Sequence, residues 1–211
     1  ASKSYGVEIL GGDTDEAEDI IISVFLVGIC ERKDLILRSG ARPGDLLAVT
    51  GSFGLTSSAF KILLEELDAP KRLKQRILRS VYWPKVKLTL GLSLHRLGAT
   101  ASIDSSDGLA WSLHELSKAS RVGFKITSLP LAHEAGEFAR LHGLDPFDLA
   151  FYGGEEYEIV ATFNPKVFSK AEDKLRRKFK VIGRVTCERE IVFDDGKVRR
   201  RIEPLGWEHF K

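Results

Sequence analysis

Short apolar segments of strand length alternate with longer amphipathic segments along most of this chain, and this alternation restricts the folds that it can adopt. Residues 46–50 predict a short strand after a turn-rich connector. Residues 109–120 predict a helix, because Leu109, Leu113 and Leu116 fall on one helical face. Interleaved strands and helices of this kind are typical of an α/β or α+β fold with mixed strand order.

The same patterns predict the remaining elements. Further strands are expected at residues 7–10, 20–30, 101–103, 123–127, 181–184 and 191–193. Further helices are expected at residues 57–67, 71–80, 86–97, 134–141 and 166–178. Residues 150–163 predict a strand that the GGEE sequence interrupts, and Asp195-Gly196 predicts a hairpin turn before residues 197–202. The connector at residues 33–45 marks the expected boundary between a strand-rich part and the interleaved part.

Composition excludes several classes of protein. The 211 residues carry a formal net charge of +2, so the charge balance points neither to nucleic acid nor to an anionic membrane surface. The longest apolar run, residues 20–30, is too short to cross a bilayer, which takes about 20 residues. We find no secretory signal pattern and therefore expect a cytoplasmic protein. The chain contains no Met, and we expect it to begin inside a longer gene product or to have been cut.

Three acidic loops that contain glycine each follow a short apolar segment. They are GGDT at residues 11–14, DSSDG at 104–108 and GGEE at 153–156. A strand that ends at the edge of an open sheet presents its next residues where ligands bind, and glycine lets the backbone approach a phosphate. Because carboxylates repel phosphate, they suit this position when Mg²⁺ lies between the two. The loops therefore predict a magnesium–phosphate site, in which Asp104 and Asp107 could reach one metal cluster.

The same loops also have a purely structural interpretation. Asp, Ser and Gly are common turn formers and helix caps, so Asp107 could be only the N-cap of the helix that begins at Leu109. Trp207, near the chain end, could pack the tail onto the core or offer a stacking surface to a flat ligand. Two other chemistries are disfavoured. No Gly-Lys-Ser/Thr follows Gly54, as a Walker-type NTPase requires, and the GxSxG elbow of many serine hydrolases is missing.

The order of several motifs along the chain resembles one known family. The motifs are GGDT at 11–14, RSGARPGD at 38–45, TG at 50–51, IDSSDGL at 103–109, GGEEYE at 153–158 and GWEHF at 206–210. Together they resemble the thiamine-monophosphate kinases, which belong to the superfamily of aminoimidazole ribonucleotide synthetase and selenophosphate synthetase. The resemblance covers essentially the whole chain, and the pair of SDGL and GGEEYE loops points to the kinases within the superfamily.

The resemblance implies a two-domain fold and a homodimer. Residues 1–36 would be a remnant of an N-terminal domain that binds ATP and contributes strands to a dimeric β-barrel, and residues 37–211 would be a C-terminal α/β domain. The family carries further residues before the GGDT loop, including more aspartates for magnesium. We therefore expect this chain alone to be inactive.

The resemblance also implies roles for individual residues. Mg²⁺ would be bound by Asp13, Asp104 and Asp107. ATP would contact Gly12, Asp13, Arg38 and Ser106. Thiamine phosphate would face Glu155 and Trp207, since a carboxylate and an indole both suit the fixed positive charge of the thiazolium ring. One departure from the family is Glu156, where the usual residue is Asp.

The implied reaction is direct in-line transfer of the γ-phosphoryl group of ATP to thiamine phosphate, which gives thiamine diphosphate and ADP. Donor and acceptor are both anionic, so Mg²⁺ would offset their repulsion and no covalent intermediate is required. Two alternatives stay open. One is another ATP-dependent enzyme of the superfamily, of the aminoimidazole ribonucleotide synthetase or hydrogenase-maturation type. The other is a non-catalytic chain that keeps the fold as a binding module.

Overall fold

The computed structural model describes residues 2–171 and 173–206, and it contains two compact units. Unit 1 is Ala1–Leu35 and unit 2 is Ile36–Lys211. That residues 1–36 are the remnant of a separate ATP-binding domain stays a prediction. In the part of the chain that is described, no helix combines the length and the apolar character that a membrane crossing requires.

Unit 1 has little regular structure. It contains the short helix α1 (Ser2–Tyr5) and the 3₁₀ turn η1 (Arg32–Asp34). The strands predicted at residues 7–10 and 20–30 are not formed, so the sequence prediction was wrong here. A strand is stable when its backbone pairs with a neighbouring strand. Within the described residues, no strand of the sheet pairs with residues 7–10 or 20–30. Its apolar side chains are correspondingly exposed, as for Phe25, which is 92% exposed.

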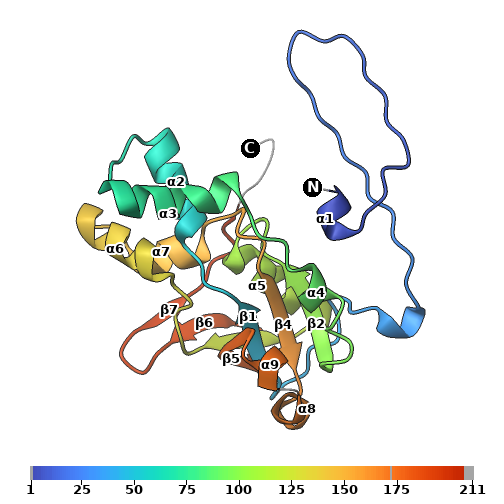
Figure 1. The fold of residues 1–211 in the computed structure, drawn as a ribbon. Helices are drawn as coiled ribbons and strands as arrows, with labels where there is room; N and C mark the ends of the chain where they lie inside the picture. Colours follow the sequence, from blue (N-terminus) through green and yellow to red (C-terminus); the bar gives the residue numbers. More distant parts are fainter. Residues whose placement is uncertain (1, 172, 207–211) are drawn as a thin grey trace. The chain divides into compact units, whose positions relative to one another are not determined.

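A seven-stranded sheet forms the centre of unit 2 (Figure 1). Its strands are β1 (Leu46–Thr50), β2 (Ala99–Asp104), β3 (Gly123–Ile126), β4 (Ile159–Phe163), β5 (Phe179–Thr186), β6 (Ile191–Asp194) and β7 (Arg199–Arg201). The order across the sheet is β2-β4-β1-β5-β3-β6-β7. The pair β3–β6 is parallel and the other five pairs are antiparallel. The mixed α/β class expected from the sequence is confirmed.

Apolar side chains cover both faces of this sheet. Leu47 and Val49 of β1 pack into a cluster with α5 and α7, whereas Ala48 packs on the other face with Phe163 and Phe168. This is the alternation that a strand buried on both faces requires. A third cluster joins α2, α3 and α6, which Figure 1 shows grouped together. The helices are α2 (Leu55–Leu64), α3 (Lys71–Tyr82), α4 (Leu88–Gly91), α5 (Leu109–Ser120), α6 (His133–His142), α7 (Pro146–Phe151), α8 (Pro165–Lys170) and α9 (Asp173–Arg176).

In unit 2, three predicted elements differ in type or length from those observed. The strand expected from residue 150 begins at Ile159, because residues up to Phe151 belong to α7. Asp145 caps α7 by accepting a hydrogen bond from the N–H of Phe147 at 2.9 Å, and Pro146 occupies the first turn. The helix expected at 86–97 is reduced to α4, and the one expected at 166–178 is replaced by α8 and α9.

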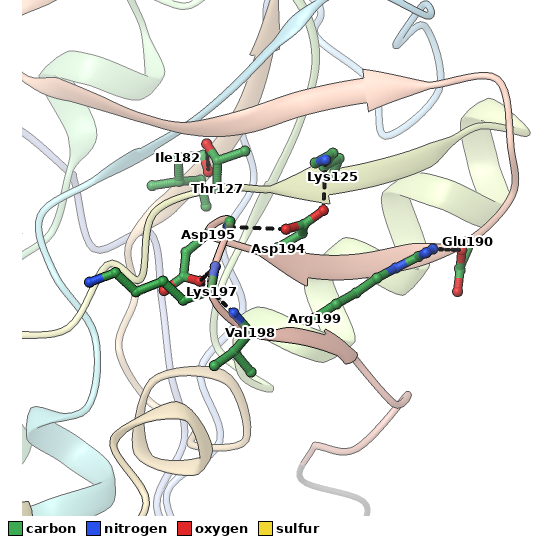
Figure 2. Close-up of polar contacts among 10 residues, drawn as sticks. Lys125, Thr127, Ile182, Glu190, Asp194, Asp195, Lys197, Val198 and Arg199 are labelled. Atoms are coloured by element: carbon green, nitrogen blue, oxygen red, sulfur yellow. Dashed lines mark hydrogen bonds and ion pairs between the residues drawn. The ribbon is translucent and has the colours of Figure 1, made fainter.

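The hairpin of β6 and β7 contains the predicted turn (Figure 2). The carboxylate of Asp195 accepts hydrogen bonds from the N–H groups of Lys197 and Val198, each at 2.9 Å. Beside the turn, Lys125 Nζ lies 2.7 Å from Asp194 Oδ2. β7 lies at the edge of the sheet and consists of three arginines. Charged side chains on an edge strand disfavour pairing with another chain.

Candidate functional site

Two of the three predicted acidic loops, DSSDG and GGEE, meet at the same end of neighbouring strands, and this end of the strands is called the sheet edge below. Asp104, the last residue of β2, lies opposite Ile159, the first residue of β4. Val160 in turn lies opposite Val49 in β1. The loops that follow β1 and β2 therefore lie beside the loop that precedes β4, although the three are far apart in the sequence.

The backbones of the two acidic loops are in direct contact. The N–H of Glu155 donates to the carbonyl oxygen of Ser106 at 2.6 Å. Gly108 has a φ of +102°, and a Cβ placed on it would lie 1.9 Å from the carbonyl oxygen of Gly153. Glycine is thus required at position 108 both by the backbone conformation and by the neighbouring loop.

Three carboxylates are exposed at this edge: those of Asp104, Asp107 and Glu155. The hydroxyl of Tyr157 donates a hydrogen bond to Glu155. This bond, together with burial and the charges of Asp104 and Asp107, raises the pKa of Tyr157 to about 12. Within residues 2–171 and 173–206, no basic side chain forms an ion pair with Asp104 or Asp107. The edge therefore carries concentrated negative charge that a divalent cation would neutralise.

Two residues of the segment before β4 have a strained backbone. Glu155 and Tyr157 have φ values of +63° and +51°, in the left-handed region that non-glycine residues rarely adopt. Each such residue costs about 1 kcal/mol or more, and such strain is concentrated at functional sites. The side chains of these two residues are hydrogen-bonded to each other, and the strained backbone supports a role for the loop beyond that of a turn.

Glu156 lies in the same loop but has different partners. Its carboxylate Oε1 accepts a hydrogen bond from the N–H of Gly54 at 2.6 Å, at the start of α2. Burial raises the pKa of Glu156 to about 7, although the Gly54 N–H acts in the opposite direction. In this chain the side chain of Glu156 thus joins the loop before β4 to the loop after β1.

We expect Glu156 to make the stability of the chain depend on pH. The pKa of the folded state, about 7, exceeds the usual value of 4.5, so the folded state binds more protons between these values. The free energy of unfolding should therefore fall as pH rises from 4.5 to 7, by up to about 3 kcal/mol at 1.36 kcal/mol per pKa unit. Urea unfolding at several pH values should show this fall in the wild type but not in Glu156→Gln. Glu65→Gln, at the exposed residue directly after α2, should keep the wild-type dependence. Equal slopes for all three proteins would contradict the assignment.

Arg38 lies along α5 in this structure. Its guanidinium Nη1 is 3.5 Å from Glu115 Oε2, and its carbonyl oxygen accepts a hydrogen bond from Ser120 Oγ at 3.1 Å. Glu115 is six residues into α5, about 9 Å along the helix axis from its start. The predicted contact of Arg38 with ATP stays a prediction.

The other predicted site residues are outside unit 2 or outside the described chain. Gly12 and Asp13 lie in unit 1, where the Asp13 carboxylate accepts a hydrogen bond from the N–H of Thr14 at 2.9 Å. Trp207 lies outside the described residues. Among the residues that are described, no three His, Cys, Asp or Glu side chains are placed to hold one metal ion. The grouping of Asp13 with Asp104 and Asp107 stays a prediction.

The sequence reasoning missed one ion pair at this edge. Lys87 Nζ lies 2.9 Å from Glu158 Oε1, and Glu158 Oε2 accepts a hydrogen bond from Thr50 Oγ1 at 2.5 Å. Glu158 belongs to the GGEEYE motif, but the motif predicts no role for it. Lys87 lies in the connector between α3 and α4, where no local pattern marks it, so its partner is visible only in the folded chain.

A pocket of about 730 Å³ opens beside Glu155. Phe60 and Leu64 of α2 contribute to its wall, and Gly206 lies at its margin. A Cβ on Gly206 would lie 2.5 Å from the carbonyl oxygen of Asp107, so the chain here runs against the acidic loop. The volume falls in the range of small-molecule sites.

Comparison with known proteins identifies the family of this chain. The family described as "AIR synthase related protein, C-terminal domain" matches residues 42–195. The thiamine-monophosphate kinase of Nitrosopumilus maritimus is 34% identical over 214 residues, which cover all of this chain and 67% of that protein. The kinase of Pyrococcus abyssi is 36% identical over 210 residues, which cover 99% of this chain and 63% of that protein.

A solved structure of AaThiL complexed with AMPPCP and TMP has the same fold. It superposes with a TM-score of 0.71 at 28% identity, covering 83% of this chain and 54% of that one. The chain thus spans about two thirds of the length of the two kinases. The expected resemblance in fold and family is confirmed. The chain belongs to the AIR synthase-related family and is a homologue of the thiamine-monophosphate kinases.

Proposed function

We propose that this chain is the C-terminal part of an enzyme that uses Mg²⁺ and ATP to phosphorylate thiamine phosphate to thiamine diphosphate. The observation that carries the proposal is the sheet edge at which Asp104 and Asp107 lie beside the Glu155 loop, exposed and without a basic partner in the described chain. It is supported by the homologous kinases and by the relative that is complexed with AMPPCP and TMP.

The residues present at this edge fit Mg²⁺. Asp104 and Asp107 offer the hard carboxylate oxygens that Mg²⁺ prefers. Their charges also contribute to the raised pKa of Tyr157, whose largest cause is the hydrogen bond to Glu155. When bound there, Mg²⁺ would neutralise phosphate charge during the transfer. The protein's own contribution is to hold the two carboxylates in place. The N–H of Ser106 donates to Asp104 Oδ2 at 3.3 Å, which orients that carboxylate.

The pocket beside Glu155 suits the organic part of thiamine phosphate. Its α2 wall provides Phe60 and Leu64 for an apolar ring, and the Glu155 carboxylate complements the fixed positive charge of the thiazolium. Tyr157 holds that carboxylate through its hydroxyl. Trp207 lies outside the described residues, and that its indole faces thiamine phosphate is part of the proposal on the strength of the family resemblance alone.

The remaining expectations form part of the same proposal. In the complete protein, Gly12, Asp13, Arg38 and Ser106 would contact ATP, and Asp13 would join Asp104 and Asp107 around Mg²⁺. The complete protein would be a cytoplasmic homodimer in which residues 1–36 belong to an ATP-binding domain. These expectations are drawn from the similarity to the kinases. They concern the complete protein, because this chain spans only about two thirds of the length of its relatives.

The proposal can be tested with the complete gene product. We expect ADP and thiamine diphosphate to form together from Mg–ATP and thiamine phosphate, with the products separated by liquid chromatography. We also expect thermal stabilisation by Mg–ATP plus thiamine phosphate. Stabilisation by a purine precursor in place of thiamine phosphate would instead identify another enzyme of the superfamily. Absence of turnover and of stabilisation by any of these ligands would favour a non-catalytic binding module.

A further inference from the structure

We propose that Glu158 and Lys87 are positioning residues that fix the DSSDG loop, residues 104–108, at the sheet edge and thereby set its affinity for Mg²⁺. The proposal rests on the function proposed above, but the part that concerns the loop can be tested separately.

Glu158 is held from two sides. Its Oε2 atom accepts the hydrogen bond from Thr50 Oγ1 at 2.5 Å, and its Oε1 atom lies 2.9 Å from Lys87 Nζ. The side chains of Glu158 and Lys87 are 12% and 23% exposed, so water screens this pair far less than a surface pair. Gly51 leaves room for this carboxylate, because a Cβ there would lie 2.4 Å from a Glu158 carboxylate oxygen.

The backbone of Glu158 connects this arrangement to the acidic loop. Its N–H donates to Ser105 Oγ at 2.9 Å, and Ser105, which is fully buried, is the residue directly after Asp104. The next N–H, that of Ile159, donates to Thr50 Oγ1 at 2.8 Å. A displacement of Glu158 would therefore be transmitted to the residue that joins Asp104 to the rest of its loop.

The ion pair also determines the partner of Lys87. Lys87, Asp104 and Tyr157 line one pocket, so the lysine borders the same space as the first residue of the acidic loop. Its ammonium group is paired with Glu158. Without Glu158, a lysine at this position could neutralise Asp104 and weaken the binding of a divalent cation.

Stability alone does not account for a carboxylate at this position. Burial raises the pKa of Glu158, against the Thr50 hydrogen bond and the Lys87 charge, so the ionised group loses hydration on folding. Well-packed apolar side chains often stabilise a fold at least as well as a buried ion pair. The Glu158 carboxylate has in addition a geometric role, because it joins the end of β1, at Thr50, and the connector before α4, at Lys87, to the segment before β4. An apolar side chain cannot provide these contacts.

The test uses Lys87→Met, Glu158→Gln and Lys87→Arg in the complete gene product, with Lys74→Met as control. Lys74 forms an exposed ion pair with Asp68, far less buried than the Lys87 pair. We expect the half-saturating Mg²⁺ concentration to rise about tenfold or more in Lys87→Met and Glu158→Gln, as is typical when a group that supports metal ligands is removed. The KM for thiamine phosphate should change less than about threefold. Lys87→Arg keeps a positive charge that can pair with Glu158, so it should keep most of the wild-type Mg²⁺ affinity.

Hydrogen exchange gives a second readout that does not depend on catalysis. In Lys87→Met, amides of residues 104–108 and 158–159 should exchange about tenfold faster, while amides of α6 stay unchanged. If the wild type makes no thiamine diphosphate, the function proposed above fails, and faster exchange confined to these segments would still support the fixed loop. Unchanged exchange there, or equal acceleration throughout unit 2, would overturn the positioning role. An unchanged Mg²⁺ requirement in an active protein would overturn its link to the metal.

Discussion

Asp104→Asn and Asp107→Asn should each lower kcat for thiamine diphosphate formation by a hundredfold or more. Each change replaces a carboxylate that we propose to bind Mg²⁺ with a neutral amide, so the phosphate charge would be less neutralised. A bound metal ion supplies several kcal/mol of transition-state stabilisation. At 1.36 kcal/mol per factor of ten, even the loss of about 3 kcal/mol gives two powers of ten. Steady-state kinetics of the complete gene product over a range of Mg²⁺ concentrations would measure this effect.

The fold should tolerate both substitutions. Asp104 and Asp107 are exposed, and within the described chain neither takes part in an ion pair. Their melting temperatures should therefore stay close to that of the wild type. Asp68→Asn is the control. It removes an exposed carboxylate that pairs with Lys74 on the surface, and it should keep normal turnover. Near-normal turnover in both acidic-loop variants would end the catalytic assignment.

Gly108→Ala should lower the free energy of unfolding by about 2–6 kcal/mol. Its φ of +102° and ψ of +157° lie in a region that side chains other than glycine scarcely enter, which costs about 1–3 kcal/mol. The added methyl group would also lie 1.9 Å from the carbonyl oxygen of Gly153. Forcing extra volume into a packed contact of this kind costs about 1–3 kcal/mol more, as overpacking a core does. Urea unfolding monitored by circular dichroism would measure the loss.

Gly143→Ala separates these two costs. Gly143 ends α6 with a φ of +62°, and nothing lies within 4 Å of a Cβ placed there. This variant should lose only about 1–2 kcal/mol, the cost of a left-handed residue without a clash. If Gly108→Ala were no worse than Gly143→Ala, the close contact between the two acidic loops would be refuted.

The elements that the sequence predicted correctly are those in which local pattern and tertiary burial agree. In α5, Leu109, Leu113 and Leu116 repeat at helical spacing, and all three are fully buried against the sheet. The meeting of two acidic loops was also predictable, since strand ends in an open sheet share an edge. The contact between Glu155 and Ser106 has this origin.

The elements that were missed depend on partners that the local sequence does not reveal. Residues 20–30 have strand composition, but a strand forms only when another strand pairs with it. Phe151 is apolar and precedes a strand, yet the cap at Asp145 sets a helix that includes it. Lys87 meets Glu158 because β4 brings the loop before it to the same edge, a fact of topology with no local pattern.

The position of β4 in the sheet sets the order in which this edge can assemble. β4 lies between β2 and β1, yet it is the last of the three in the chain. A nascent chain that has left the ribosome only as far as α7 contains both flanking strands without the one that joins them. Pairings between distant segments form slowly because long loops must close first. A partly made chain therefore cannot offer the assembled edge to a ligand until β4 has been synthesised.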